Sequence, residues 1–107
     1  MLVPFPYSDL RGSKRRPACV VSALPYNDQS PDVVLAMVTS SSARVQQPGR
    51  GDVALRGWRA AGLRLPSVLR AGRLLVLEQR LLGPVLGELT SSDLRGVDAS
   101  LRLVLGL

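Results

Sequence analysis

The side chains available for chemistry in this sequence limit the catalytic options before any structural element is assigned. The chain has no histidine and a single cysteine, Cys19, so it lacks the usual acid/base of neutral pH and the ligand set of a zinc site. Its eight carboxylates include no closely spaced pair of the D-x-D kind, which argues against a two-metal nuclease. A catalytic site must therefore rely on arginine, serine or threonine, isolated carboxylates and backbone donors, and we expect neither a metal nor a cofactor.

The charge balance indicates a polyanionic partner. Lysine and arginine number 14 against 8 aspartates and glutamates, a net charge of +6, and Lys14 is the only lysine. Arginine binds phosphate through two parallel hydrogen bonds and stacks on bases, so nucleic acid or an acidic protein tail would be attracted. A solvated, arginine-rich surface is the alternative explanation for any single arginine.

Short strands and one helix are the elements that must position these side chains. Residues 32–39 give the clearest strand, and their continuous apolar character predicts burial on both faces. Further strands are expected at residues 2–5, 18–22, 52–55, 67–70, 74–78 and 83–86, with turns or loops at 7–13, 24–31 and 40–51 and a helical turn at 58–62. The 40–51 loop is expected to be exposed and mobile.

The C-terminal residues change to a helical period. Apolar side chains recur at helical spacing, at Leu94, Val97, Leu101, Val104 and Leu105. Ser91 or Ser92 is expected to cap this helix, with Asp93 in its first turn. The apolar stripe is interpreted as core or dimer surface.

Together these patterns predict one domain, residues 1–107, of the mainly β (α+β) class: a small barrel with a C-terminal amphipathic helix. No apolar run is long enough to span a bilayer, and no signal peptide is recognised. A lone cysteine fits a reducing compartment, so a cytoplasmic location is expected.

The most specific motif lies between Phe5 and Ser22, where the chain reads FPYSDLRGSKRRPACVVS. Further motifs follow in order at residues 26–27, 38–40, 62–70, 87–94 and 105–107. In this order and spacing the sequence resembles the MazF/PemK family of toxin–antitoxin ribonucleases over nearly its whole length. Members of that family typically show F-P-F/Y, a loop, and then K-x-R-P-A-x-V-x-S.

The resemblance implies an SH3-like β-barrel of the MazF/PemK/CcdB type, a homodimer, and sequence-selective cleavage of single-stranded RNA that inhibits translation and growth. It also implies a cognate antitoxin with an acidic tail, and binding of operator DNA only as a toxin–antitoxin complex. By position in the motifs, Arg16 matches the catalytic arginine of the family and Thr39 the threonine that accompanies it.

The chemistry of these two residues agrees with that assignment. In metal-free cleavage the 2′-OH attacks the adjacent phosphate, and the growing charge must be neutralised. Arg16 can hold the phosphoryl oxygens as an electrostatic clamp and Thr39 can add a hydroxyl donor, whereas a guanidinium is a poor proton acceptor. The proton acceptor stays unassigned. We further expect contacts to RNA from Lys14, Arg15, Ser40, Arg44 and Arg70.

Two departures from the family pattern leave alternatives open. Arg70 is followed by Ala71 and Gly72, where family members commonly carry an acidic residue, and Met1 begins inside the first expected strand. A CcdB-like toxin that binds gyrase without nuclease activity is one alternative, and an inactive nucleic-acid-binding regulatory relative is the other.

The predicted residues also have simpler structural interpretations. Arg16 precedes a proline and can hold an extended entry to a strand, and Thr39 can cap a turn. Cys19 is interpreted as a small buried hydrophobe, and a structural role is favoured for Trp58 over stacking on a base.

Overall fold

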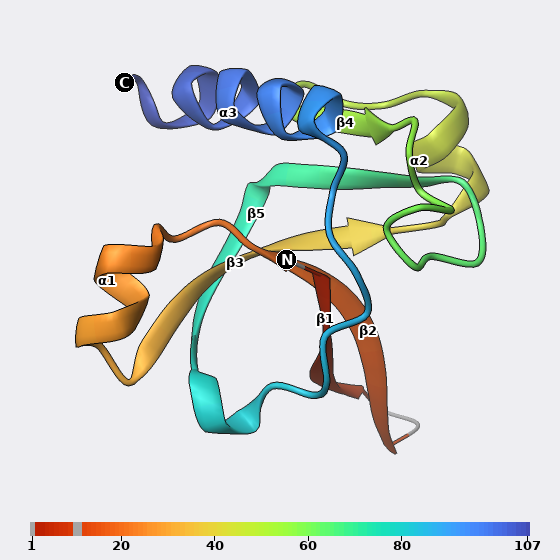
Figure 1. The fold of residues 1–107 in the computed structure, drawn as a ribbon. Helices are drawn as coiled ribbons and strands as arrows, with labels where there is room; N and C mark the ends of the chain where they lie inside the picture. Colours follow the sequence, from red (N-terminus) through yellow and green to blue (C-terminus); the bar gives the residue numbers. More distant parts are fainter. Residues whose placement is uncertain (1, 10–11) are drawn as a thin grey trace.

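One antiparallel sheet and a C-terminal helix form the architecture. The computed structural model describes the backbone of residues 2–9 and 12–107 and the side chains of residues 16–107. The elements follow in the order β1 (Leu2–Asp9), β2 (Gly12–Val20), α1 (Leu24–Gln29), β3 (Asp32–Thr39), α2 (Ser42–Gln46), β4 (Asp52–Leu55), β5 (Ser67–Glu78), η1 (Gln79–Leu81) and α3 (Ser91–Leu105) (Figure 1). The predicted α+β class is confirmed.

The sheet has the strand order β1-β2-β3-β5-β4. All neighbouring pairs are antiparallel, and the strands curl so that β1 and β2 lie below α3 and β4 in Figure 1. Within the described backbone the pairings leave β1 and β4 as edge strands, so hydrogen bonds do not close the predicted barrel there. Edge position explains how β1 accommodates Pro4 and Pro6, which cannot donate to a ladder.

Strand β3 has the bounds predicted from the sequence and is the centre of the core. Val33 and Leu35 pack with Ala18 in one apolar cluster, whereas Ala36 and Val38 belong to a second cluster under α3. The two sets alternate along the strand, as a pleated strand requires. The predicted burial of both faces is therefore confirmed.

The two strands predicted at residues 67–70 and 74–78 are one strand, β5, with a bulge. Ala36 pairs with Leu74, but the next residue, Met37, pairs with Arg70, so residues 71–73 lie opposite a single step of β3. The strand bends there (Figure 1). Gly72 interrupts the apolar pattern and so suggested that one strand ends there, although glycine within a strand also marks bulges.

Several predicted loops are regular structure. The predicted turn at 7–13 falls largely within β1 and β2, residues 24–31 contain α1, and the predicted mobile loop at 40–51 contains α2. Conversely, the strand predicted at 83–86 is irregular chain. The helical turn predicted at 58–62 is a turn in which the Ala61 amide donates to the Gly57 carbonyl at 3.0 Å, and Gly62 closes it with φ +90°.

Polar contacts explain why residues 24–31 fold as α1. The Ser22 hydroxyl donates to the Asn27 amide oxygen at 2.6 Å, and the Asn27 amide donates back to the Ser22 carbonyl at 3.0 Å. From η1, the Gln79 side chain donates to the carbonyls of Asn27 and Ser30. This short helix buries none of its residues, so no apolar period marks it in the sequence.

Helix α3 begins at Ser91, so its N-cap lies one residue before the first predicted cap, and its first turn anchors it. Thr90, not Ser91 or Ser92, is the N-cap, and its hydroxyl accepts from the Asp93 amide at 3.2 Å. Val97 is buried and Leu101 is half-buried, but three other members of the predicted stripe are exposed: Leu94, Val104 and Leu105. The stripe is thus only partly core. No helix among the described residues has the length and apolar content needed to cross a membrane.

Candidate functional site

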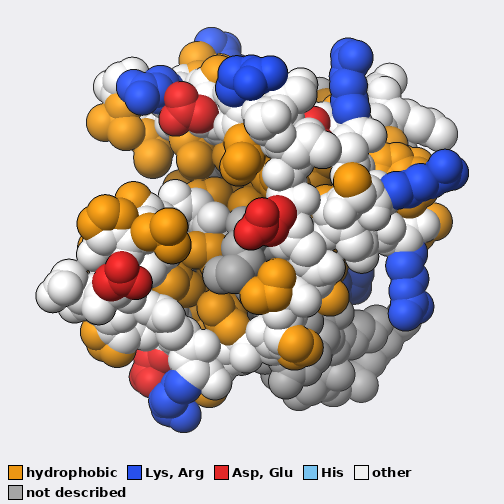
Figure 2. All heavy atoms as spheres, viewed as in Figure 1, with side chains coloured by type: hydrophobic (Ala, Val, Ile, Leu, Met, Phe, Trp, Pro, Cys, Tyr) orange, Lys and Arg blue, Asp and Glu red, His pale blue; other side chains and the backbone are white. Residues whose placement is uncertain are grey.

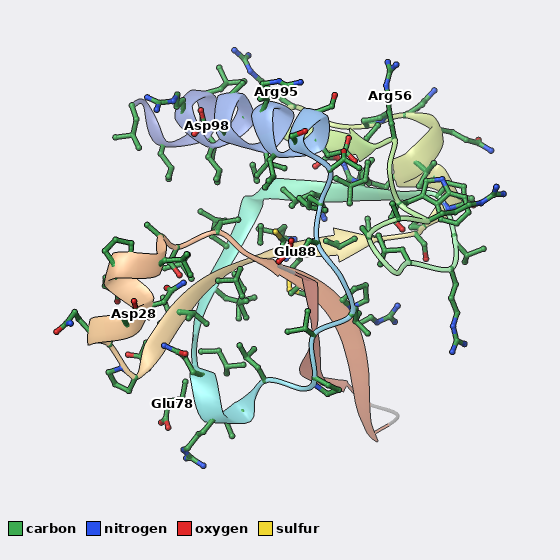
Figure 3. All side chains as sticks on the ribbon, in the orientation of Figure 1. Asp28, Arg56, Glu78, Glu88, Arg95 and Asp98 are labelled. Atoms are coloured by element: carbon green, nitrogen blue, oxygen red, sulfur yellow. The ribbon has the colours of Figure 1, made fainter. Side chains whose placement is uncertain are left out.

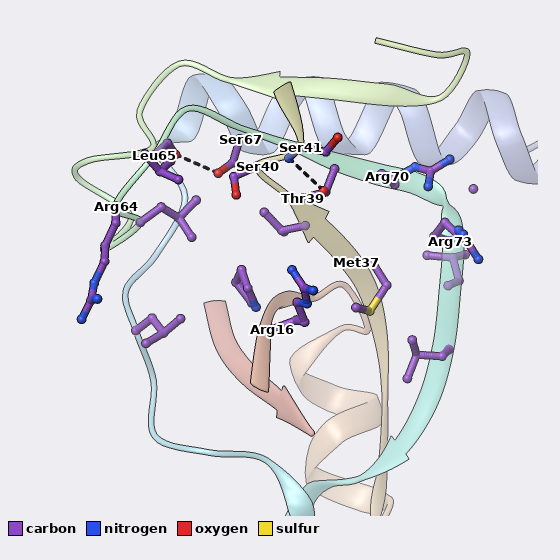
Figure 4. A pocket seen from close by; sticks show the side chains of 18 residues that line it. Arg16, Met37, Thr39, Ser40, Ser41, Arg64, Leu65, Ser67, Arg70 and Arg73 are labelled. Atoms are coloured by element: carbon purple, nitrogen blue, oxygen red, sulfur yellow. Dashed lines mark hydrogen bonds between the residues drawn. The ribbon is translucent and has the colours of Figure 1, made fainter. Parts of the chain in front are cut away.

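A pocket of about 1060 Å³ opens on the face of the sheet opposite α3 (Figure 4). Strands β2, β3 and β5 and the segment 62–65 line it. Ala18 of β2 pairs with Met37 of β3, so Arg16, two residues before Ala18, and Thr39, two residues after Met37, lie at the same end of this strand pair. Met37 in turn pairs with Arg70 of β5. Strand pairing therefore gathers side chains that are far apart in the sequence.

The lining is basic and rich in hydroxyls. It contains four arginines, Arg16, Arg64, Arg70 and Arg73, and four hydroxyl residues, Thr39, Ser40, Ser41 and Ser67. Among the described residues that line the pocket, none is acidic. Four arginines around a cavity whose described lining has no carboxylate create a positive potential that attracts phosphate.

Four of the seven residues predicted for the site meet in this pocket: Arg16, Thr39, Ser40 and Arg70. Arg44, on α2, is not among its lining residues. The side chains of Lys14 and Arg15 lie outside the described residues.

Arg64 and Arg73 are basic lining residues that the sequence reasoning missed. Arg73 lies three residues after Arg70, and in a regular strand residues three apart point to opposite faces. The bulge in β5 explains why both line the pocket. Arg64 follows the Gly62-Leu63 motif directly, a signal that could have identified it.

Thr39 ends β3, and its hydroxyl group contributes to the turn that follows. Its hydroxyl oxygen accepts a hydrogen bond from the Ser41 amide at 3.2 Å, which shapes the turn after the strand. The hydroxyl proton stays available for donation, since that bond uses only an oxygen lone pair. Figure 4 shows Arg16, which is exposed, reaching into the pocket beneath this end of β3.

Close backbone packing holds the segment that carries Arg64. Gly62 has φ +90°, and a Cβ there would collide with the carbonyl of Leu86. Glycine is therefore required both for the backbone conformation and for the close approach. The Ser67 hydroxyl donates to the Leu65 carbonyl at 2.8 Å, which ties the segment to the start of β5 (Figure 4).

Arg70 is paired with a carboxylate of β4, the neighbouring strand. Its Nε lies 3.4 Å from Oδ1 of Asp52 on β4, and Nη1 of Arg44 lies 3.6 Å from the other oxygen of the same carboxylate. The Asp52 side chain is 4% exposed, so this carboxylate is shared by two arginines in a largely buried position.

The described residues offer no cluster for a metal ion. No three Asp, Glu, Cys or His side chains among them gather as ligands. Figure 3 shows Asp28, Glu78, Glu88 and Asp98 well apart on different parts of the fold. Figure 2, which shows the molecule from the same side as Figure 1, likewise shows the acidic side chains on this face as isolated patches.

Cys19 and Trp58 have structural surroundings. Cys19 is 1% exposed within the cluster under α3, and burial raises the pKa of its thiol, so it stays protonated at neutral pH. This confirms its interpretation as a buried hydrophobe. Trp58 packs against the same cluster, with the Arg59 guanidinium 4.8 Å from its ring centre.

Comparison with known families and curated proteins gives consistent matches. Residues 1–105 match the family described as "PemK-like, MazF-like toxin of type II toxin-antitoxin system". Endoribonuclease MazF6 of Mycobacterium tuberculosis is 35% identical over 105 residues, covering 95% of this chain and 88% of that protein. Endoribonuclease MazF2 of Mycobacterium bovis matches with the same values.

Solved structures share the fold. A MazE–MazF crystal structure (Form-III) from Deinococcus radiodurans has a TM-score of 0.76 at 25% identity and covers 99% of this chain and 92% of its own. A mycobacterial endoribonuclease in complex with its cognate antitoxin has a TM-score of 0.73 at 25% identity, covering 98% and 92%. The Mycobacterium tuberculosis toxin MazF-mt6 has a TM-score of 0.74 at 19% identity, covers 97% of each chain, and has the same fold.

Proposed function

This chain belongs to the PemK-like, MazF-like toxins of type II toxin–antitoxin systems, and we propose that it cleaves single-stranded RNA without a metal ion. The family predicted from the sequence motifs is thereby confirmed. The observation that carries the proposed reaction is the pocket itself, where Arg16 and Thr39 meet among further arginines with no acidic side chain in the described lining. A phosphodiester is the substrate group that such a lining fits.

The proposed reaction is an internal transfer. The 2′-oxygen of the RNA attacks the adjacent phosphorus, the bond from phosphorus to the 5′-oxygen breaks, and the products are a 2′,3′-cyclic phosphate and a 5′-hydroxyl. The 2′-hydroxyl loses its proton to an acceptor that we leave unassigned, and the leaving oxygen gains one. Nucleophile and target are already in one molecule, so charge stabilisation and alignment are the main tasks of the protein.

Arg16 and Thr39 are proposed to perform those tasks. Two parallel hydrogen bonds from Arg16 to the non-bridging oxygens would stabilise charge as it grows, and the Thr39 hydroxyl would add one donor. Arg64, Arg70, Arg73 and Ser40 surround this centre and would bind neighbouring phosphates. Lys14, Arg15 and Arg44 are proposed to extend the contact with RNA beyond the pocket.

The proposed partners follow from the same surface. An antitoxin with an acidic tail would place carboxylates on the arginines that bind RNA, and so would inhibit by competition. The MazE–MazF and mycobacterial endoribonuclease–antitoxin complexes, which share this fold, support this proposal. We further propose a homodimer, with operator DNA bound only by the toxin–antitoxin complex.

Cleavage of a long single-stranded RNA in excess EDTA tests the function. Wild-type protein should give discrete fragments, and Arg16→Ala should lower the rate by about 10²–10³-fold, the usual loss for one preorganised donor. Arg80→Ala is the matched control, because it removes the same charge from an exposed position where Arg80 pairs with Glu78. Arg16→Ala protein that is folded and as active as wild type would refute the assignment.

A further inference from the structure

We infer that Asp52 is a positioning residue of the pocket, which orients the Arg70 guanidinium for contact with an RNA phosphate. The inference rests on the proposed ribonuclease function and adds a residue that does not itself line the pocket. Its basis is the contact between two neighbouring strands: Asp52 of β4 pairs with Arg70 of β5 in the sheet. Arg70 lies at the last regular step before the β5 bulge.

The carboxylate lies beside Arg70 on the same face of the sheet, because directly paired residues of neighbouring strands point to one face. Oδ1 of Asp52 is 3.4 Å from Nε of Arg70, with the Asp52 side chain 4% exposed and the Arg70 side chain 25% exposed. Nε itself is buried and makes no hydrogen bond of acceptable geometry with any described residue, so the ion pair is its compensation. A buried guanidinium edge without this partner would be costly, which favours one orientation of the side chain.

Asp52 is itself fixed by the turn that precedes β4. The Gly49 amide donates to its Oδ2 at 2.8 Å, and the Asp52 amide donates to the Gly49 carbonyl at 3.0 Å. A Cβ at Gly49 would lie 2.8 Å from Nη1 of Arg44 and 3.3 Å from Oδ2 of Asp52. The turn thus holds the carboxylate at a defined place, and a bulkier residue at Gly49 would disturb it.

The pairing leaves the terminal nitrogens of Arg70 for substrate. The ion pair is measured at Nε, and the two terminal nitrogens donate no hydrogen bond to another described residue. An arginine held at Nε can offer those nitrogens to phosphate oxygens without losing side-chain entropy on binding.

A purely electrostatic role and a positioning role of Asp52 predict opposite effects of Asp52→Asn on RNA binding. Asp52→Asn removes one negative charge near a basic pocket, so electrostatics alone would tighten RNA binding. If Asp52 orients Arg70, the same change weakens binding despite the added positive charge. Asp98→Asn is the matched control, because Asp98 is an exposed residue of α3 whose loss adds the same charge away from the pocket.

The test is a binding titration at fixed salt with a fluorescent single-stranded RNA that carries 2′-deoxy nucleotides and so resists cleavage. We expect Asp52→Asn and Arg70→Ala each to weaken binding about 10-fold, the scale of one charge-assisted contact, and Asp98→Asn not to weaken it. The double variant should bind as Arg70→Ala does, since Asp52 acts through Arg70. Asp52→Asn that binds as well as wild type, or effects that multiply in the double variant, would overturn the inference.

Two further measurements separate the possible failures. Urea unfolding shows whether Asp52→Asn remains folded under the binding conditions. If it does not, RNA binding by Asp52→Glu is compared with that of Arg70→Ala, because Asp52→Glu keeps the negative charge but moves the carboxylate. Binding as weak as that of Arg70→Ala shows that the position of the carboxylate matters, and binding equal to wild type shows that only its charge does. Wild-type protein that binds the RNA but does not cleave a natural one would refute the proposed ribonuclease and leave the role of Asp52 to the titration. Wild-type protein that does not bind RNA would refute both.

Discussion

Removal of the Asp93 carboxylate should destabilise the fold far more than removal of any exposed carboxylate on the same helix. Asp93 is 5% exposed, and its two oxygens accept from the Arg56 amide at 3.2 Å and the Gly57 amide at 2.9 Å. These bonds join the first turn of α3 to the end of β4. In Asp93→Ala both backbone amides lose a charged acceptor that nothing replaces.

The expected magnitude follows from those two bonds. A hydrogen bond to a charged group contributes about 1.5 kcal/mol or more, so Asp93→Ala should lower the free energy of unfolding by about 3 kcal/mol. For a chain of this size that corresponds to a fall in Tm of about 12 °C or more. The assay is urea unfolding followed by circular dichroism, with protein concentration held fixed because the proposed dimerisation would contribute to stability.

Asp98→Ala is the control for this prediction. Asp98 is exposed and pairs with Arg102 one turn along the helix, an arrangement that contributes about 0.5 kcal/mol or less. If Asp93→Ala unfolded within about 0.5 kcal/mol of Asp98→Ala, the proposed anchoring of α3 would be wrong.

Three other positions give compact tests. Gly62→Ala should destabilise the fold by about 2 kcal/mol or more in urea unfolding, because it adds both strain and a clash with Leu86; Gly106→Ala, with φ +74° and open space around it, should cost less, and equal losses would contradict the clash. Burial raises the pKa of the Cys19 thiol above its ordinary 9.0, so the folded state favours the protonated thiol. This preference stabilises the fold fully below pH 9, and the stabilisation is lost as the pH rises through the raised pKa. Unfolding of Cys19→Ala should then depend less on pH between 8 and 10 than unfolding of wild type does, and parallel curves would argue against it. Gly72→Asp should fold normally, since a Cβ there meets nothing within 4 Å, and should weaken RNA binding by adding a negative charge to the pocket; a rise in kcat would instead show that a carboxylate base improves the reaction.

Strongly periodic elements were predictable from the sequence, and elements held by tertiary contacts were not. β3 was predicted with its observed bounds because an apolar run of that length has one satisfactory location, the centre of the sheet. Helix α1 was missed because it buries no residue and depends on Ser22 and on Gln79, which is far away in the chain. A bulge in β5 was mistaken for a gap between two strands, since Gly72 interrupts the apolar pattern.

The candidate site shows the same division. Arg16, Thr39 and Arg70 were predicted from motifs, and the pairing of β2, β3 and β5 explains why they line one pocket. Arg73 could not be placed, because only the bulge brings it to the surface that Arg70 occupies. The role inferred for Asp52 depends on pairing between β4 and β5, a contact that no local pattern around Asp52 indicates.

The central claim is that the RNA supplies its own nucleophile and that the pocket stabilises the resulting charge. Its most direct test is an oligonucleotide with a single 2′-deoxy substitution at the nucleotide before the cleaved bond, compared with the all-ribose strand in excess EDTA. The account predicts that this substitution abolishes cleavage at that bond and leaves binding nearly unchanged, while the all-ribose strand yields a 2′,3′-cyclic phosphate. Cleavage of the substituted strand at the same bond would show that the nucleophile is external, and would contradict the account.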